Sequence, residues 1–169
     1  GYIAAGNINY AIFLCSSSNS NTFWNNTATG NAWGIYLDSS TGNTIYLNTF
    51  NSGRSNSANT WNSTTKIAHR CSSTYVGNRW SGYSGLDSDG DGIGDTPYSI
   101  PGGSEKDLYP ITDNYGPRTL TVCASGCGYT TIQAAINAAC PGDTIEVQSG
   151  TYYENVVVNK ALTLKGVVS

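Results

Sequence analysis

Short stretches in which apolar and polar residues alternate recur through residues 1–60, and Ser, Asn, Thr and Gly separate them. Residues 11–17 line up with 34–40 at a spacing of 23, and residues 21–26 line up with 43–48 at a spacing of 22. Alternation with a period of two is typical of β-strands, and strands this short cannot form a core alone. A register repeat of this kind predicts a β-solenoid, in which each unit makes one turn and stacks on the next.

Equivalent residues of stacked turns lie about 4.8 Å apart and therefore form ladders. The alignment predicts three of them: Ile12 over Ile35, Leu14 over Leu37 and Asn21 over Asn43. The first two are apolar and are expected inside the coil, and the third is expected to join amides at a corner. An antiparallel sandwich of short strands is the alternative, but a match in register favours the solenoid.

Aromatic residues and glycines replace the repeat in the segment 61–112. An open solenoid end exposes unpaired strand edges and apolar core, so this segment is predicted to form a cap. Trp61 and Trp80 are expected to pack inside the cap, and sugar stacking on their ring faces is the alternative. His69 is expected to be an exposed loop residue, because no further metal-binding residue lies near it in the sequence.

The character of the chain changes after a linker at 113–118. Residues 119–169 are predicted to begin a second solenoid that contains the one convincing helix, at 131–139, with Thr130 or Thr131 as its N-cap. Pro141, Gly142 and Asp143 are expected to stop the helix. The predicted strands of this part are 119–122, 144–147, 155–158 and 161–166.

The stretch LDSDGDGIGDTPY at 86–98 holds four of the eleven acidic residues. Carboxylates this close repel each other unless a cation lies among them. Asp87, Asp89 and Asp91 take positions 1, 3 and 5 of an EF-hand loop, with Gly92 at the turn position and the carbonyl of Ile93 at position 7. The sequence therefore predicts a structural calcium site, to which Asp95 is also assigned.

The match to an EF-hand then ends. Tyr98 replaces the bidentate Glu at position 12, and Pro97 excludes a helix that follows at once. A switching calcium sensor is therefore not expected, and Asp107 is a candidate late ligand. The alternative is a solvated acidic turn without an ion.

Five cysteines in a chain rich in Asn, Ser and Tyr indicate an oxidising, extracellular setting. Cys123 and Cys127 enclose a tight loop and are expected to pair, although Cys127 with Cys140 is an alternative. Cys15, Cys71 and Cys140 are candidates for a second disulfide or, because the number is odd, for a bridge between molecules. The alternative for Cys15 is a buried, reduced thiol inside the coil.

The charge and the hydropathy of the chain argue against nucleic acid and membrane insertion as modes of binding. A net charge of -3 without a Lys/Arg cluster argues against nucleic acid. No apolar run approaches the about 18 residues of a membrane span, and the first residues lack the charged start of a signal peptide, so a targeting segment is expected to have been removed or the sequence to be part of a longer chain. The sequons at Asn25 and Asn62 are compatible with glycosylation.

Two parts of the chain resemble a known family. Residues 80–98 with 107–110 resemble the end of the right-handed parallel β-helix modules of archaeal surface proteins, and residues 129–136, 141–145 and 150–156 resemble the start of such a module. These modules are related to the NosD proteins and to the carbohydrate-binding and sugar-hydrolase β-helices. The resemblance implies the last turns of one β-helix followed by the first turns of the next.

This order suggests how copies interact. Open coil ends expose strand edges, so residues 119–169 of one copy are expected to stack on residues 1–60 of another. The expected function is that of an extracellular structural protein of an archaeal envelope, filament or sheath. A carbohydrate-binding module of a cell-surface protein is the alternative.

Enzymatic activity is not expected. Sugar hydrolases need paired carboxylates, and the first coil offers only Asp38 and Arg54. Asp143, Glu146 and Glu154 of the second coil belong to separate elements. Copper binding, which the NosD resemblance implies, is not expected either, since the chain has one His and no Met.

Overall fold

The computed structural model describes residues 1–167, and the chain divides into two compact units. Unit 1 comprises Gly1–Ile67 and Ser73–Tyr115. Unit 2 comprises Ala68–Ser72 and the chain from Gly116 onward. The short segment Ala68–Ser72, which separates the two stretches of unit 1, is therefore part of unit 2.

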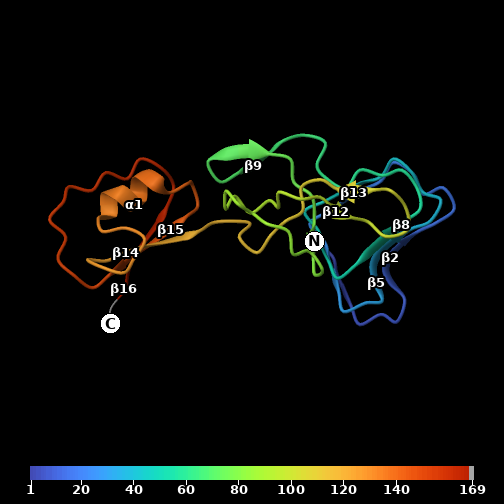
Figure 1. Ribbon diagram of the computed structural model, residues 1–169, viewed down its shortest axis with the longest axis horizontal. Helices are drawn as coiled ribbons and strands as arrows, with labels where there is room; N and C mark the ends of the chain where they lie inside the picture. Colours follow the sequence, from blue (N-terminus) through green and yellow to red (C-terminus); the bar gives the residue numbers. More distant parts are fainter. Residues whose placement is uncertain (168–169) are drawn as a thin grey trace. The chain divides into compact units, whose positions relative to one another are not determined.

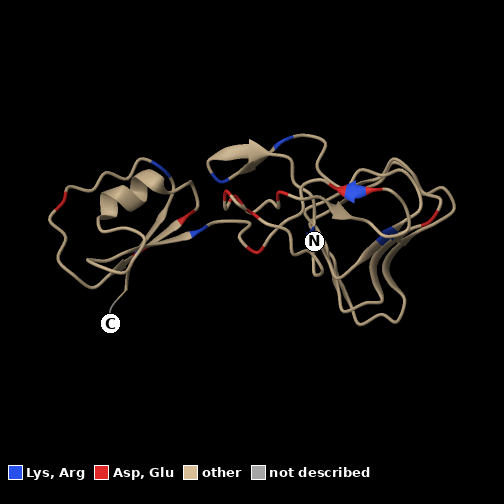
Figure 2. Cartoon of the chain, in the orientation of Figure 1, with Lys and Arg blue, Asp and Glu red and all other residues tan. Residues whose placement is uncertain are grey.

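Unit 1 is a parallel β-solenoid (Figure 1). Its sheets have the strand orders β1-β4-β7-β11, β2-β5-β8 and β3-β6, and the cap adds the antiparallel pair β12-β13. None of the strands β1 to β7 carries a charged residue (Figure 2). The strands are β1 (Ile3–Ala5), β2 (Tyr10–Leu14), β3 (Thr22–Trp24), β4 (Thr27–Thr29), β5 (Trp33–Leu37), β6 (Thr44–Tyr46), β7 (Thr49–Phe50), β8 (Gly53–Ser55), β11 (Arg79–Trp80), β12 (Tyr98–Ser99) and β13 (Lys106–Asp107).

The apolar ladders confirm the register that the repeat predicts. Ile12 pairs with Ile35 and Leu14 pairs with Leu37. At the third level Ile35 meets Gly53, where a Cβ would lie 2.7 Å from the Trp80 ring. The missing side chain at Gly53 thus makes room for an aromatic plug from the cap, which stacks on Tyr98 with a ring separation of 4.7 Å.

Trp61 and Trp80 are both buried in the core of unit 1, as predicted. His69 is a correction to the sequence analysis, because it is buried and not an exposed loop residue. It ends β9 (Ile67–His69), which forms a two-stranded sheet with β10 (Ser72–Thr74). Successive side chains of a strand face opposite ways, so the exposed position of Ala68 leaves His69 on the buried side.

Two asparagine ladders follow the corners of unit 1, and both run in one direction. In each rung the backbone N–H and the side-chain N–H of one Asn donate to the Oδ1 atom of the Asn in the next turn. The donor–acceptor distances along both ladders lie between 2.8 and 3.2 Å. The ladders are Asn21, Asn43 and Asn59, which includes the predicted rung, and Asn26, Asn48 and Asn78.

Each ladder ends on a carboxylate of the cap. Asn59 donates its backbone N–H to Glu105, and Asn78 donates both N–H groups to Asp107 Oδ2 at 2.6 and 3.2 Å. The indole of Trp61 donates to Glu105 and that of Trp80 to Asp107, each at 2.9 Å. An ionised carboxylate accepts hydrogen bonds without offering a donor, so it ends a series of donors and leaves no N–H unsatisfied.

Unit 2 contains a three-stranded parallel sheet of order β14-β15-β16 and a single described helix (Figure 1). Four of the five predicted elements are present. The predicted strand at 155–158 is wrong, because Gln133 pairs with the Val157 backbone through both atoms of its side-chain amide. The elements are β14 (Thr119–Val122), α1 (Ile132–Ala138), β15 (Thr144–Gln148) and β16 (Thr163–Val167).

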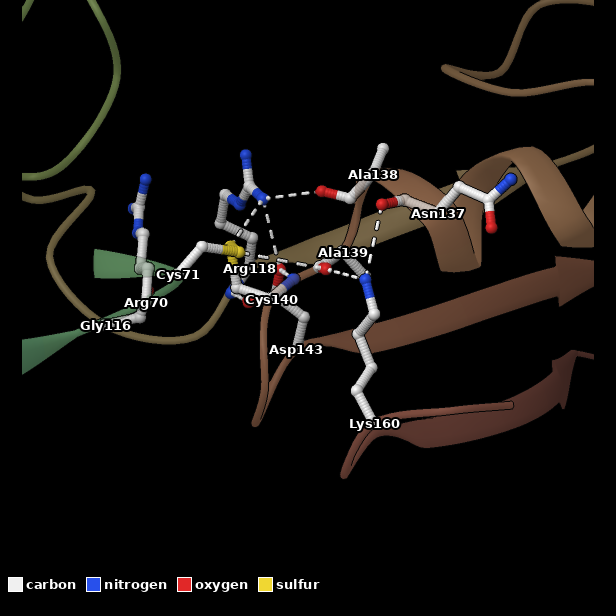
Figure 3. Close-up of polar contacts among 10 residues, drawn as sticks. All are labelled: Arg70, Cys71, Gly116, Arg118, Asn137, Ala138, Ala139, Cys140, Asp143 and Lys160. Carbon is white, nitrogen blue, oxygen red and sulfur yellow. Dashed lines mark hydrogen bonds and ion pairs between the residues drawn. A yellow bond between two sulfur atoms is a disulfide. The ribbon is translucent and has the colours of Figure 1, made fainter. Parts of the chain in front are cut away.

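Charged side chains hold both ends of helix α1. At its start, Thr131 Oγ1 accepts from Ala134 N, and the Glu154 carboxylate accepts from the first two helical N–H groups at 2.8 and 2.9 Å. At its end, Arg118 and Lys160 donate to the last carbonyls (Figure 3). These signs match the helix dipole, which favours an anion at the first turn and cations at the last.

Two disulfides lie within unit 2. Cys123 pairs with Cys127, as expected, and Cys71 pairs with Cys140 across a sequence separation of 69. The alternative pair Cys127–Cys140 is therefore wrong. Asp143 is fully buried beside this second bridge, where Arg118 N and Cys140 N donate to its carboxylate (Figure 3). Burial raises the pKa of Asp143, but these hydrogen bonds and the Arg118 charge outweigh it, and the pKa is lowered.

The ladder terminus Asp107 predicts an unusual pH dependence. Burial raises the pKa of Asp107 from 3.8 to about 6, although hydrogen bonds from Trp80, Asn78 and Tyr109 oppose the shift. The folded protein then holds the proton more tightly than the unfolded chain. The free energy of unfolding is therefore predicted to fall by about 3 kcal/mol as pH rises from about 4 to about 6.

Urea unfolding of the natural chain and of Asp107→Asn across this pH range measures the effect. The variant is predicted to be less stable and to lose this slope. Asp87 and Asp143 do not obscure it, because their lowered pKa values affect stability only below about pH 4. A natural chain whose stability rises between pH 4 and 6 contradicts the prediction.

Candidate metal centre

The acidic loop brings three carboxylates together in unit 1. Asp87, Asp89 and Asp91 each offer an oxygen, and these atoms lie within 4.8 Å of one another. Gly90 and Gly92 lie between and after them with φ values of 67° and 92°, a backbone conformation that glycine adopts without strain. The sequence analysis predicted calcium ligands at these three positions because their spacing follows positions 1, 3 and 5 of an EF-hand loop.

Asp87 anchors the loop to a distant segment. Its Oδ2 atom accepts from Gly92 N at 3.0 Å, from the Thr112 hydroxyl at 2.9 Å and from the Asn114 amide at 3.4 Å. Burial raises its pKa, but these hydrogen bonds outweigh that effect, and the pKa is lowered from 3.8. Asp87 is therefore charged at neutral pH. Its Oδ1 atom is buried and accepts no hydrogen bond from the described residues.

The other two carboxylates shape the loop through its own backbone. Asp89 Oδ1 accepts from Asp91 N at 3.1 Å, and Asp91 Oδ1 accepts from Ile93 N at 2.6 Å. Each is a local side-chain turn that fixes the residue two positions on. The loop is thus held in its curved form by the same side chains that would coordinate a cation.

The remaining predicted ligands lie differently. Asp95 Oδ2 accepts from Ser88 N at 2.9 Å, and Asp95 is outside the group of three. Ile93 forms a bridge with Ile111. Asp107 as a late ligand is wrong, because it is fully buried at the end of an asparagine ladder, where both of its oxygens accept hydrogen bonds.

Thr112 and Asn114 were missed by the sequence analysis. They lie 25 and 27 residues beyond Asp87, so no local spacing identifies them. Both are polar residues in the segment that was assigned to the end of the cap and the linker. Only the fold brings that segment beside the acidic loop.

The other candidate sites are separate from the loop. Asn25 is exposed at a corner with a φ of 56°, whereas the partly buried Asn62 donates its side-chain amide to the Ser63 carbonyl. Cys15 is a free and exposed cysteine, so a buried thiol inside the coil is wrong. The reason is the strand alternation, which points Leu14 inward and leaves Cys15 outside.

Comparison with known proteins agrees with the fold. Residues 3–85 match the model of a family described as periplasmic copper-binding protein (NosD). Residues 3–85 are a NosD-like β-helix module. The matched residues include strands β1 to β11 and end just before the acidic loop. No curated protein and no solved structure matches the chain.

The copper in that family's description does not fit the residues found here. Copper is bound by imidazole, thiolate or thioether groups, and the chain has one His and no Met. Four of its cysteines form disulfides. The gathered donors are carboxylates of the loop, which suit hard cations such as calcium and magnesium. In the described part of the chain, no helix is long and apolar enough to span a membrane.

The close approach of Gly92 to Tyr115 predicts different effects for alanine at the two glycines of the acidic loop. A Cβ at Gly92 would lie 2.5 Å from the Tyr115 Cα atom, whereas one at Gly90 would meet nothing within 4 Å. Both residues have positive φ. Gly90→Ala is therefore predicted to cost only the backbone penalty, about 1 kcal/mol, and Gly92→Ala at least about twice as much. Urea unfolding of both variants measures this, and equal losses would show that the loop does not rest on Tyr115.

Proposed function

We propose that this chain is an extracellular structural protein of an archaeal cell envelope, filament or sheath, in which β-solenoids of successive copies stack end to end. The NosD-like module supports a periplasmic or extracellular setting, and two disulfides suit an oxidising compartment. The archaeal assignment rests on the resemblance to archaeal surface modules.

Unpaired strand edges carry this proposal. In unit 1 the strands β1, β2 and β3 each lie at an edge of their sheet, and in unit 2 β16 lies at the edge of its sheet. All four belong to parallel sheets, so β16 of one copy suits the edge of a first-turn strand of another. The inner residue Leu164 of β16 is 48% exposed, although its partner Ile145 is fully buried.

The acidic loop would serve this structure by binding a calcium ion. Three carboxylates within 4.8 Å of one another repel each other, and the buried Asp87 Oδ1 has no donor. A divalent cation relieves both problems. Because Asp87 also holds Thr112 and Asn114, the ion would fix the segment that leaves the first solenoid.

Catalysis is not part of the proposal. The carboxylates of unit 2 that a sugar hydrolase would need already have structural partners: Asp143 holds Arg118, Glu146 pairs with Lys165, and Glu154 caps helix α1. A glycosidase needs two carboxyl groups that face one bond. The partners of these three side chains place them in separate roles.

Glycan binding is the second candidate, and an exposed aromatic group favours it. Tyr10, Phe13 and Tyr36 lie together on the sheet β2-β5-β8, with ring centroids 4.8 to 5.3 Å apart. The Arg54 guanidinium lies 5.5 Å from the Tyr36 ring. Exposed rings beside a cation suit sugar rings with polar substituents.

Stacking predicts that a charge at the open edge blocks assembly. Leu164→Lys places a charge on the last rung of the apolar ladder of unit 2 and should abolish higher oligomers. Thr163→Lys, on the exposed neighbour that faces the other way, is the matched control and should assemble normally. Sedimentation velocity and electron microscopy measure both. Oligomers of Leu164→Lys like those of the natural chain, or a natural chain that is monomeric, would contradict stacking.

A structural calcium ion predicts calcium-dependent stability. At a hundredfold excess over its Kd, calcium should stabilise the fold by about 2.7 kcal/mol, a rise of several degrees in Tm. Asp89→Asn removes an exposed ligand and should abolish most of the rise, whereas Asp38→Asn, in the coil, should retain it. Thermal melts in calcium and in chelator test this, and an identical Tm in both would exclude a needed ion.

A further inference from the structure

A second polar feature of unit 1 is a cavity of about 340 Å³ on the outer side of the coil. Thr49 and Arg79 pair in neighbouring strands, and the residues that follow them, Phe50 and Trp80, are buried. Because side chains of a strand alternate, Thr49 and Arg79 therefore point outward. The cavity is further lined by Ser81, Tyr83, Thr112 and Asp113.

The one cation of this lining has a weakly held partner. Arg79 Nη1 lies 2.5 Å from Asp113 Oδ1, and the Asp113 side chain is fully exposed. Water screens such a pair, so it contributes little to stability. An incoming carboxylate can replace Asp113 and form two parallel hydrogen bonds with the guanidinium. Asp113 thus occupies the place that a ligand carboxylate would take.

Hydroxyl groups line much of the remaining cavity wall, which also includes Trp80, Gly85 and Ile111. The Thr112 hydroxyl donates to Asp87, so toward the cavity it can only accept a hydrogen bond. The Ser81 hydroxyl donates to the Phe50 carbonyl at 3.4 Å and can likewise only accept from a ligand, whereas the Thr49 hydroxyl can donate or accept. The Tyr83 hydroxyl donates to the Thr96 carbonyl at 2.7 Å, which fixes its ring as a wall. Such a lining suits a ligand that carries several hydroxyl groups.

We propose that this cavity binds a sugar acid, with the ligand carboxylate on Arg79 and its hydroxyl groups on Thr49, Ser81 and Thr112. The volume lies at the lower end of the range for small-molecule sites, which suits a single sugar unit. The inference rests on the second candidate function, glycan binding, and gives it a ligand class. It does not involve the aromatic group around Tyr10.

Titration of the isotope-labelled chain with galacturonate or glucuronate, followed by NMR, tests the proposal. The amide signals of Thr49, Arg79, Ser81 and Thr112 should shift in a saturable way. Neutral galactose should bind at least about tenfold more weakly, because it lacks the charge that pairs with Arg79. Inorganic phosphate is the third probe, and phosphate binding without sugar-acid binding would refute the proposal.

Three variants make the test specific. Arg79→Gln should weaken sugar-acid binding by about tenfold or more, and Asp113→Asn should strengthen it by about threefold because it removes the competing carboxylate. Lys66→Gln, which removes an exposed charge elsewhere in unit 1, should leave binding unchanged. Unaltered affinity in both Arg79→Gln and Asp113→Asn would overturn the site. Shifts at Tyr10 and Tyr36 alone would support glycan binding but place it elsewhere.

Discussion

The hydrogen bond from one asparagine to the next is the interaction on which unit 1 depends. Each turn donates two N–H groups to one amide oxygen of the following turn, so the ladders have a direction as well as a spacing. A directional ladder needs a different residue at its end. Glu105 and Asp107, two residues apart in the cap, meet that need because an ionised carboxylate accepts without donating. The two carboxylates thus end the hydrogen-bonded ladders of the coil. The Trp80 ring, which lies over Gly53, covers the apolar core at the same end.

Because the cap closes one end of the coil in unit 1, the two ends of this coil differ. The strands β1, β2 and β3 lie at the edges of their sheets, whereas the opposite end of the coil is covered by the aromatic cap. In unit 2 a helix takes the part that the cap has in unit 1. Glu154, Arg118 and Lys160 hold helix α1, which covers the apolar side of the sheet. The chemistry-bearing residues outside these structural roles, the acidic trio and the outer cavity, lie on the capped side of unit 1. Thr112 connects the two, because it contacts Asp87 and lines the cavity.

The sequence predicted what is periodic or local. The pairing of Ile12 with Ile35 follows from the repeat, and the grouping of Asp87, Asp89 and Asp91 follows from their spacing. Residue type predicted a threonine cap for the helix at Thr130 or Thr131, and the structure has it at Thr131. Contacts between distant segments could not be predicted in this way. Asn59 and Glu105 are 46 residues apart, and Cys71 and Cys140 are separated by 69. The segment 155–158, with its three valines, was wrongly predicted as a strand because β-branched residues favour strands, whereas here the Gln133 side chain satisfies the backbone of Val157.

Hydrogen–deuterium exchange of the dilute chain tests most directly whether the carboxylate-ended cap closes the coil. Protection should be highest in β11, which belongs to the cap, and in β7, which pairs with it, and should decline through β4 to β1 at the far edge of the sheet. Asp107→Asn should reduce protection first in β11. Uniform protection along the coil, or protection that is highest in β1, would contradict the claim that the cap stabilises the coil.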